Sequence, residues 1–222
     1  MAGLLLVLLV AVLDWVAVAR SWRRLELLAK PLTLAVLFVV LALVGRFHSL
    51  PLIFFGLGLL FSLAGDILLL FSERWFVAGL GAFLLAHLCY ITGFNLPPPN
   101  VSPLWSLGVA VVLAVSMARL LRRIVAGLRA RNQTKLVIPV TAYSLVLTLM
   151  LLAALLTMLR LDWNAAAALL AALGAFLFFL SDILLAWDRF VTPVRNGRLF
   201  NMILYHLGQL MLITGVLLQF AK

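Results

Sequence analysis

Long apolar runs, separated by short segments that contain charged residues, proline or glycine, dominate this sequence. A helix that crosses a bilayer needs about 20 mostly apolar residues. Eight runs meet or approach this length: Ala2–Ala19, Pro31–Val44, Leu52–Phe71, Phe76–Gly93, Leu104–Leu121, Leu136–Leu159, Ala165–Ala186 and Leu199–Phe220. The second run is short, and a start within Leu25–Lys30 would bring it to full length. The runs are continuous rather than alternating with polar residues, so they predict an all-α bundle of eight transmembrane helices and not a membrane barrel.

The composition excludes a soluble protein. Hydrophobic residues make up 66% of the chain and charged residues 11%, whereas a soluble domain is about half apolar and about a quarter charged. The connections between runs are too short to hold a soluble domain, so residues 1–222 are interpreted as a single integral membrane domain. The first run lacks a basic n-region and a polar cleavage region, which indicates a retained helix rather than a signal peptide. The lone cysteine, Cys89, excludes an intrachain disulfide.

The basic residues gather in alternate connections. Of the 17 lysines and arginines, 14 lie in the connections between runs 1 and 2, 3 and 4, 5 and 6, or 7 and 8, counting Arg119 at the end of run 5, and the others are Arg46, Arg160 and Lys222. The positive-inside rule therefore predicts that these connections are cytoplasmic and that both termini are not. For a bacterial protein, the membrane would be the inner one. The net charge of +10 then needs no nucleic-acid partner, and the basic segment Arg119–Lys135 is expected to contact anionic lipid headgroups.

Two halves of the sequence resemble each other. Residues Leu63–Leu69 read LAGDILL, and Phe179–Leu185 read FLSDILL. The next run carries a histidine with a polar residue three positions later, in one half His87 with Tyr90 and in the other His206 with Gln209. Further pairs in the same order are Thr92-Gly93 with Thr214-Gly215 and Pro31-Leu32-Thr33 with Pro139-Val140-Thr141. These matches predict two parallel four-helix repeats, at about 1–94 and 104–222, with a site at their interface.

Three of the seven acidic residues, Asp14, Asp66 and Asp182, lie inside apolar runs. A charged group at the bilayer centre costs at least about 2.5 kcal/mol, so these side chains should face the bundle interior. Each lies four or five residues before a predicted cytoplasmic helix end, which puts all three about 6–8 Å below that end. Further polar residues of the later helices give a polar layer in the cytoplasmic half: His87, Tyr143, Asn201, Tyr205, His206 and Gln209.

A structural role for these residues is an open alternative. Asp66 and Asp182 could pair with a histidine and hold helices together, and Asp14 could pair with Lys30 or Arg20 near the interface. Tyrosines in such positions are more often packing residues or interface anchors than chemical groups. His48, in an outer connection, is interpreted as incidental.

The pairs Gly65-Asp66 and Ser181-Asp182, the segment Lys30-Pro31-Leu32, the spacing His87-x-x-Tyr90 and the eight-helix plan together resemble the YhhN family, which includes the lysoplasmalogenases. The resemblance spans essentially the whole chain. It implies hydrolysis of the vinyl ether bond of lysoplasmalogen, a lysophospholipid with an alkenyl chain, to a fatty aldehyde and a glycerophospho-base. It also implies that Asp66 and Asp182 are the catalytic pair. Because Gln209 stands where the first repeat has Tyr90, the two half-sites are not equivalent.

The expected chemistry suits two carboxyl groups. A vinyl ether is cleaved by protonation of its β-carbon, and water then captures the oxocarbenium ion. Burial and mutual repulsion favour one protonated and one ionised carboxyl, as in glycosidases. We expect Asp182 to be the acid and Asp66 the ionised partner, with Ser181 and His206 forming a proton-donating network. This chemistry requires no cofactor or metal. The expected supporting or substrate-binding residues are His87, Tyr90, His206, Gln209, Tyr205, Tyr143, Asn201, Ser181, Lys30 and Asp14.

Three other functions compete with this interpretation. Intramembrane carboxylates and parallel repeats are also typical of proton-coupled transporters, although the acidic layer lies on one side rather than at mid-membrane. A metallohydrolase could use Asp66, Asp182, His87 and His206, but no HxxxH spacing supports it. A lipid-binding scaffold without enzymatic activity is the remaining alternative.

Overall fold

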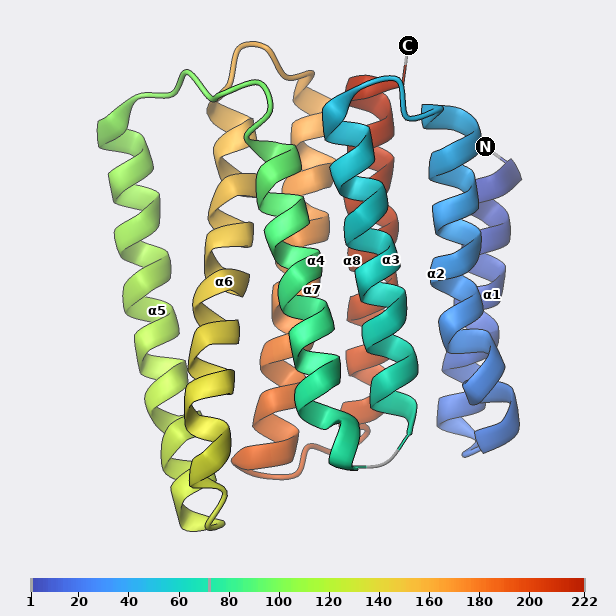
Figure 1. The fold of residues 1–222 in the computed structure, drawn as a ribbon, viewed down its shortest axis with the longest axis vertical. Coiled ribbons are helices and arrows are strands. Elements are labelled where there is room, and N and C mark those ends of the chain that lie inside the picture. The colour runs from blue at the N-terminus through green and yellow to red at the C-terminus, as the bar shows by residue number, and fades with distance from the viewer. Residues whose placement is uncertain (1, 72, 222) are drawn as a thin grey trace.

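The computed structural model describes residues 2–71 and 73–221, and across these residues the regular structure is entirely helical. Eight long helices are each apolar enough to cross a membrane (Figure 1). Their bounds are α1 Ala2–Ala19, α2 Arg23–Gly45, α3 Leu50–Leu70, α4 Phe76–Phe94, α5 Pro103–Ala130, α6 Val137–Leu156, α7 Ala165–Phe190 and α8 Gly197–Phe220. Short 3-10 turns occupy Glu73–Trp75, Thr134–Leu136 and Thr157–Leu159. The predicted all-α membrane bundle of eight helices is confirmed.

Three helices are longer than the apolar runs indicate. Helix α2 begins at Arg23, which leaves Pro31 inside the helix, α5 continues to Ala130, and α7 continues to Phe190. Most of the predicted connection after residue 121 is therefore helical. The physical reason is a second apolar cluster at this end of the bundle, in which five buried side chains pack together: Phe76, Ile124, Leu128, Val140 and Phe190. The spacing of four between the two α5 members keeps one apolar stripe on a helix whose other faces carry arginines.

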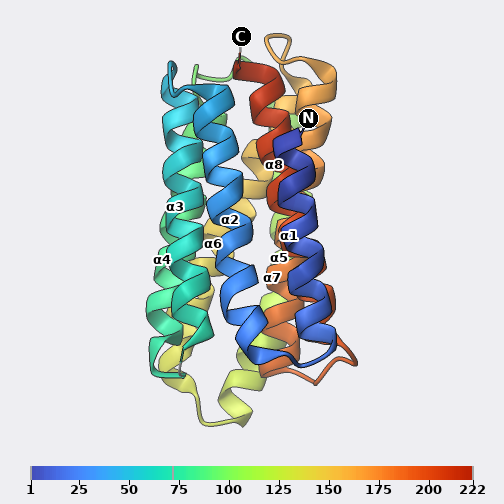
Figure 2. The same ribbon diagram turned by 90° about the vertical axis from the view of Figure 1, so that its right-hand side faces the viewer.

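The helices run alternately up and down, and both termini lie at the same end of the bundle (Figures 1 and 2). The opposite end holds the connections that follow α1, α3, α5 and α7, where most of the basic residues lie. We call it the basic end. Helix α5 lies at the edge of the bundle and buries few side chains, namely Met117, Ile124 and Leu128.

The most extensive helix packing is between α7 and α8 and between α3 and α4, which are antiparallel neighbours. At the α7–α8 contact, a Cβ placed on Gly174 would lie only 2.3 Å from the backbone nitrogen of Leu212. A Cβ on Gly208 would lie 2.7 Å from the backbone nitrogen of Phe178. Glycine at both positions therefore lets the two backbones meet, as small residues do in membrane helix pairs.

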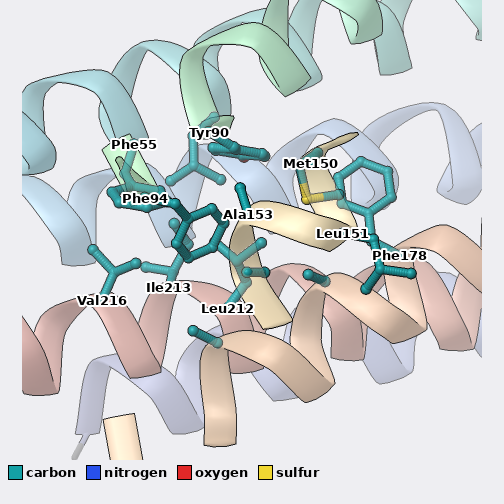
Figure 3. Packing of buried hydrophobic residues seen from close by; sticks show 14 of the residues in the cluster. Phe55, Tyr90, Phe94, Met150, Leu151, Ala153, Phe178, Leu212, Ile213 and Val216 are labelled. Carbon is teal, nitrogen blue, oxygen red and sulfur yellow. The ribbon is translucent and has the colours of Figure 1, made fainter. Parts of the chain in front are cut away.

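Most residues of the main apolar core lie in the half of the bundle nearer the termini. Figure 3 shows part of this core. Phe55 and Phe94 pack edge to face with ring centroids 4.9 Å apart, and Tyr90 stacks on Phe55 at 5.7 Å. Figure 3 shows these rings beside Met150 and Ile213, so α3, α4, α6 and α8 all contribute. Asp66 and Asp182, by contrast, lie in the half of the bundle nearer the basic end. The two-repeat organisation stays a prediction.

Candidate active site

Asp66, on α3, is almost fully buried, with 1% of its surface exposed. The Nζ atom of Lys30 on α2 lies 3.1 Å from its Oδ1 atom, and the hydroxyl of Tyr205 on α8 donates to Oδ2 at 2.8 Å. Lys30 therefore pairs with Asp66 and not with Asp14, for which Lys30 and Arg20 were the two possible partners under the structural alternative. An ion pair with a further hydrogen bond to the carboxylate is the usual way in which a buried charge is tolerated.

Asp182, on α7, is bonded from two other helices. The hydroxyl of Tyr143 on α6 donates to its Oδ2 atom, and His87 Nε2 on α4 lies 3.5 Å from the same oxygen. His87 Nε2 also lies 2.9 Å from the Tyr143 hydroxyl. Because that hydroxyl gives its proton to Asp182, the imidazole must donate at Nε2, which forms a chain from His87 through Tyr143 to Asp182. The expected partner His206 does not lie at Asp182.

Asp66 and Asp182 line one cavity, which has about 760 Å³ of empty space including its open mouth. Most of its wall is apolar and comes from α4, α5, α6 and α7 at the basic end. Besides the two aspartates, five of the predicted site residues line the wall: Lys30, Tyr143, Ser181, Asn201 and Tyr205. Asn201 Nδ2 donates to the backbone oxygen of Ser181 at 2.7 Å, which ties α8 to α7 beside Asp182.

Each aspartate is contacted by a side chain from the other half of the chain. Tyr205 of the second half bonds Asp66, and His87 of the first half lies against Asp182. The cavity therefore lies where the two halves meet, and its two carboxyl groups have different surroundings: a lysine at Asp66, and a tyrosine and a histidine at Asp182.

Tyr90 and Gln209 lie outside the cavity wall. The Tyr90 hydroxyl donates to Gln209 Oε1 at 2.9 Å, and Gln209 Nε2 donates to Ser62 Oγ at 3.1 Å. All three residues are buried. The two positions that correspond in the predicted repeats thus bond to each other, which joins α4 to α8 and points to a structural rather than a substrate-binding role.

Asp14 and His206 form a separate buried group. Asp14 is fully buried, its Oδ2 atom lies 3.9 Å from His206 Nδ1, and that nitrogen accepts a hydrogen bond from Trp15 Nε1 at 3.1 Å. Neither residue lines the cavity. The metallohydrolase alternative needs His206 together with His87, Asp66 and Asp182, and this placement separates it from them. Within the described ranges, no three His, Cys, Asp or Glu side chains gather as a metal site requires.

Sequence reasoning missed Glu26, which is 5% exposed and binds arginines from two helices. With α2 predicted to start at Arg23, Glu26 would have been recognised as a candidate, because it lies one turn before Lys30 on the same helix face. It also missed Ser144, on the cavity wall, one residue after Tyr143.

The fold and this site define a multi-pass integral membrane protein with two buried aspartates on one internal cavity. The chain belongs to the YhhN family, whose profile matches residues 25–216. It is 35% identical over 156 residues to lysoplasmalogenase TMEM86B of Mus musculus, which covers 70% of this chain and 60% of that protein. It is 32% identical over 157 residues to the protein of the same name from Homo sapiens, with coverages of 70% and 60%.

A relative named lysoplasmalogenase from Mycobacterium tuberculosis is 39% identical over 140 residues, which is 60% of this chain and 48% of that protein. The matched region thus spans about 60% of the mammalian relatives and about half of the mycobacterial one. No solved structure matches the chain.

Proposed function

We propose that this protein is a lysoplasmalogenase, which hydrolyses the vinyl ether bond of a lysophospholipid to a fatty aldehyde and a glycerophospho-base. The observation that carries the proposal is the placement of Asp66 and Asp182 on one largely apolar cavity with different partners. The names of the relatives at 32–39% identity support the same reaction.

In the proposed reaction Asp182 is the general acid. It gives its proton to the β-carbon of the vinyl ether, and the electrons of the double bond leave an oxocarbenium ion at the adjacent carbon. The hydrogen bond from Tyr143 engages Oδ2, so Oδ1 is the oxygen that carries the acidic proton. The Asp182 side chain is 12% exposed and lies at the cavity wall, where a substrate can reach it.

Asp66 supplies the negative charge. Lys30 and Tyr205 hold its carboxylate in place, and an anion beside a forming oxocarbenium ion stabilises that ion electrostatically. Water adds to the cation and loses a proton to the Asp182 carboxylate. The hemiacetal hydroxyl then loses its proton as the bond between the carbon and the glycerol oxygen breaks, and the glycerol oxygen takes up a proton. The products are the aldehyde and the glycerophospho-base, and one water is consumed.

We further propose that the basic end faces the cytoplasm and that both termini face the opposite side, because 14 of 17 basic residues lie toward that end. A lysolipid in the cytoplasmic leaflet carries its vinyl ether bond just below the headgroup. That depth corresponds to the level of the two aspartates, while the apolar wall accommodates the alkenyl chain.

The test is a hydrolysis assay with purified protein in detergent. Its substrates are a 1-alkenyl lysophospholipid and its saturated 1-alkyl and 1-acyl analogues. We expect aldehyde release from the alkenyl lipid and no product from the two analogues, because only a vinyl ether yields an oxocarbenium ion on protonation of carbon. Failure to release aldehyde, or equal cleavage of the ester, would overturn the proposal.

A further inference from the structure

A second, polar pocket adjoins the cavity at the basic end. It has about 620 Å³ of empty space including its open mouth. Five residues line both spaces: Lys30, Leu69, Leu185, Asn201 and Met202. The second pocket, which we call the vestibule, therefore lies next to the cavity that holds the two aspartates.

Two arginines of the vestibule share one carboxylate. Glu26 accepts a hydrogen bond from Arg198 at 2.6 Å, and the same Oε1 atom lies 3.2 Å from Nη1 of Arg23. The other terminal nitrogen of Arg23 donates to the backbone oxygen of Leu70 at 2.5 Å. The side chains of Arg23 and Arg198 are 51% and 63% exposed. One positive charge is thus uncompensated, and each guanidinium has five N–H donors, a geometry suited to phosphate.

Asp188 gives the same pocket a separate negative charge. Its Oδ1 atom accepts the backbone N–H of Val194 at 2.6 Å, which fixes the side chain beside the start of α8. Among the residues that the structure describes, no lysine, arginine or histidine lies within ion-pair distance of Asp188. The vestibule therefore presents an excess guanidinium charge and an unpaired carboxylate, the complement of a molecule that holds a phosphate and an ammonium group.

We propose that the vestibule binds the zwitterionic headgroup of the lysolipid, with the phosphate at Arg23 and Arg198 and the ammonium group at Asp188. This inference rests on the proposed function. Since Lys30 and Asn201 line both spaces, the glycerol unit passes between them and brings the vinyl ether bond to Asp66 and Asp182. Headgroup binding then positions the vinyl ether bond relative to Asp182, the general acid. Binding contacts remote from the reacting atoms contribute to catalysis in this way.

The kinetic test compares three alkenyl substrates at one detergent-to-lipid ratio: alkenylglycerophosphocholine, alkenylglycerophosphate and alkenylglycerol. Arg198→Gln should raise KM at least ~10-fold for the two phosphate-containing substrates, since a charged hydrogen bond is worth about 1.5–3 kcal/mol. The same variant should leave KM for alkenylglycerol unchanged, because that substrate has no phosphate. Asp188→Asn should raise KM for the phosphocholine substrate alone. Arg195→Gln is the matched control, because Arg195 is exposed in the connection just before α8 but does not line the vestibule. It should leave KM unchanged for all three substrates.

A binding test separates this inference from the proposed function. Wild-type protein should bind glycerophosphocholine by calorimetry, Arg198→Gln should bind it at least ~10-fold more weakly, and inorganic phosphate should bind more weakly than glycerophosphocholine. If wild-type protein binds the headgroup but releases no aldehyde from any substrate, the proposed function fails while the headgroup site stands. If Arg198→Gln affects all three substrates equally, or inorganic phosphate binds as tightly as glycerophosphocholine, the headgroup site is wrong.

Discussion

Lys30 and Asp66 form a buried ion pair between α2 and α3, with 3.1 Å between Nζ and Oδ1 and with both side chains less than 10% exposed. Removal of one partner from a buried pair leaves an uncompensated charge and typically costs about 3–5 kcal/mol. The pair thus links the stability of the bundle to the charge state of one cavity carboxyl.

Lys30→Met should therefore lower the thermal unfolding temperature in detergent and also reduce turnover, because Asp66 loses its counter-charge. The double variant Lys30→Met with Asp66→Asn removes both charges and should recover most of the thermal stability but no activity. A double-mutant cycle of unfolding free energies measures the coupling. Additive effects on stability would contradict a direct ion pair.

Asp66→Asn and Asp182→Asn should each reduce aldehyde release by about 10²–10⁴-fold, the range typical of a lost general acid or base. The matched control is Asp14→Asn, which makes the same change at a buried aspartate outside the cavity. Neither carboxylate oxygen of Asp14 has a hydrogen-bond partner among the described residues, so this variant should keep its activity and unfold no earlier than the wild type. Loss of turnover in the control would place Asp14 in the reaction.

The sequence was sufficient to predict the number of apolar spans and the inward placement of Asp14, Asp66 and Asp182, because both follow from the cost of exposing charge to lipid. It also predicted a polar layer, and Asp66 and Asp182 do share a cavity. It did not predict the partners of each aspartate. His206 was expected at Asp182, but His87 lies there instead and His206 lies against Trp15.

The reason is that spacing within one helix reports depth, whereas a partner depends on helix order around the bundle and on helix rotation. Glu26 illustrates this, since Arg198, which it binds, is 172 residues away in the sequence. The start of α2 is a second example: the charged residues before Pro31 masked about two turns of helix, which begin at Arg23 and bury Glu26, Ala29 and Lys30.

Tyr143→Phe should reduce kcat/KM about tenfold, because it removes the hydroxyl that bonds Asp182 and the value of one such bond is about 1.4 kcal/mol. Tyr90→Phe is the matched control, since Tyr90 is equally buried and hydrogen-bonded but contacts Gln209 outside the cavity. The control should lose about 1–3 kcal/mol of stability through the unpaired glutamine oxygen and retain its kcat. Steady-state kinetics and thermal unfolding of both variants check the prediction, and equal kinetic losses would refute it.

Gly174→Ala should destabilise the protein by about 1–3 kcal/mol, because the new methyl group would meet the α8 backbone 2.3 Å away and force α7 from α8. Those helices carry Asp182 and Tyr205, so turnover should fall as well. In Gly81→Ala the new methyl group meets nothing within 4 Å. That variant should be as stable as the wild type or more so, since alanine favours helix. Thermal unfolding of the two variants decides whether close backbone contact is required.

At the end opposite the cavity, Arg160 ties two connections together. It donates to the backbone oxygens of Phe94 and Pro97, both at 2.9 Å, and forms a two-point ion pair with Asp162. The hydrogen bonds and charge of Arg160 hold the pKa of Asp162 below its usual value of 3.8. The stabilisation is therefore fully present above pH 3.8 and is lost as the pH falls through the lower, folded-state pKa.

Asp162→Asn should accordingly unfold at a slightly lower temperature than the wild type at pH 5–7, and the difference should shrink as the pH falls below about 4. The effect should be small, because the Asp162 side chain is 49% exposed. Arg160→Gln should lose stability even where Asp162 is protonated, because its bonds to the two backbone oxygens do not depend on that carboxyl. Melting temperatures of the three proteins across pH 3–7 test this, and a difference between Asp162→Asn and wild type that is constant with pH would refute the ion pair.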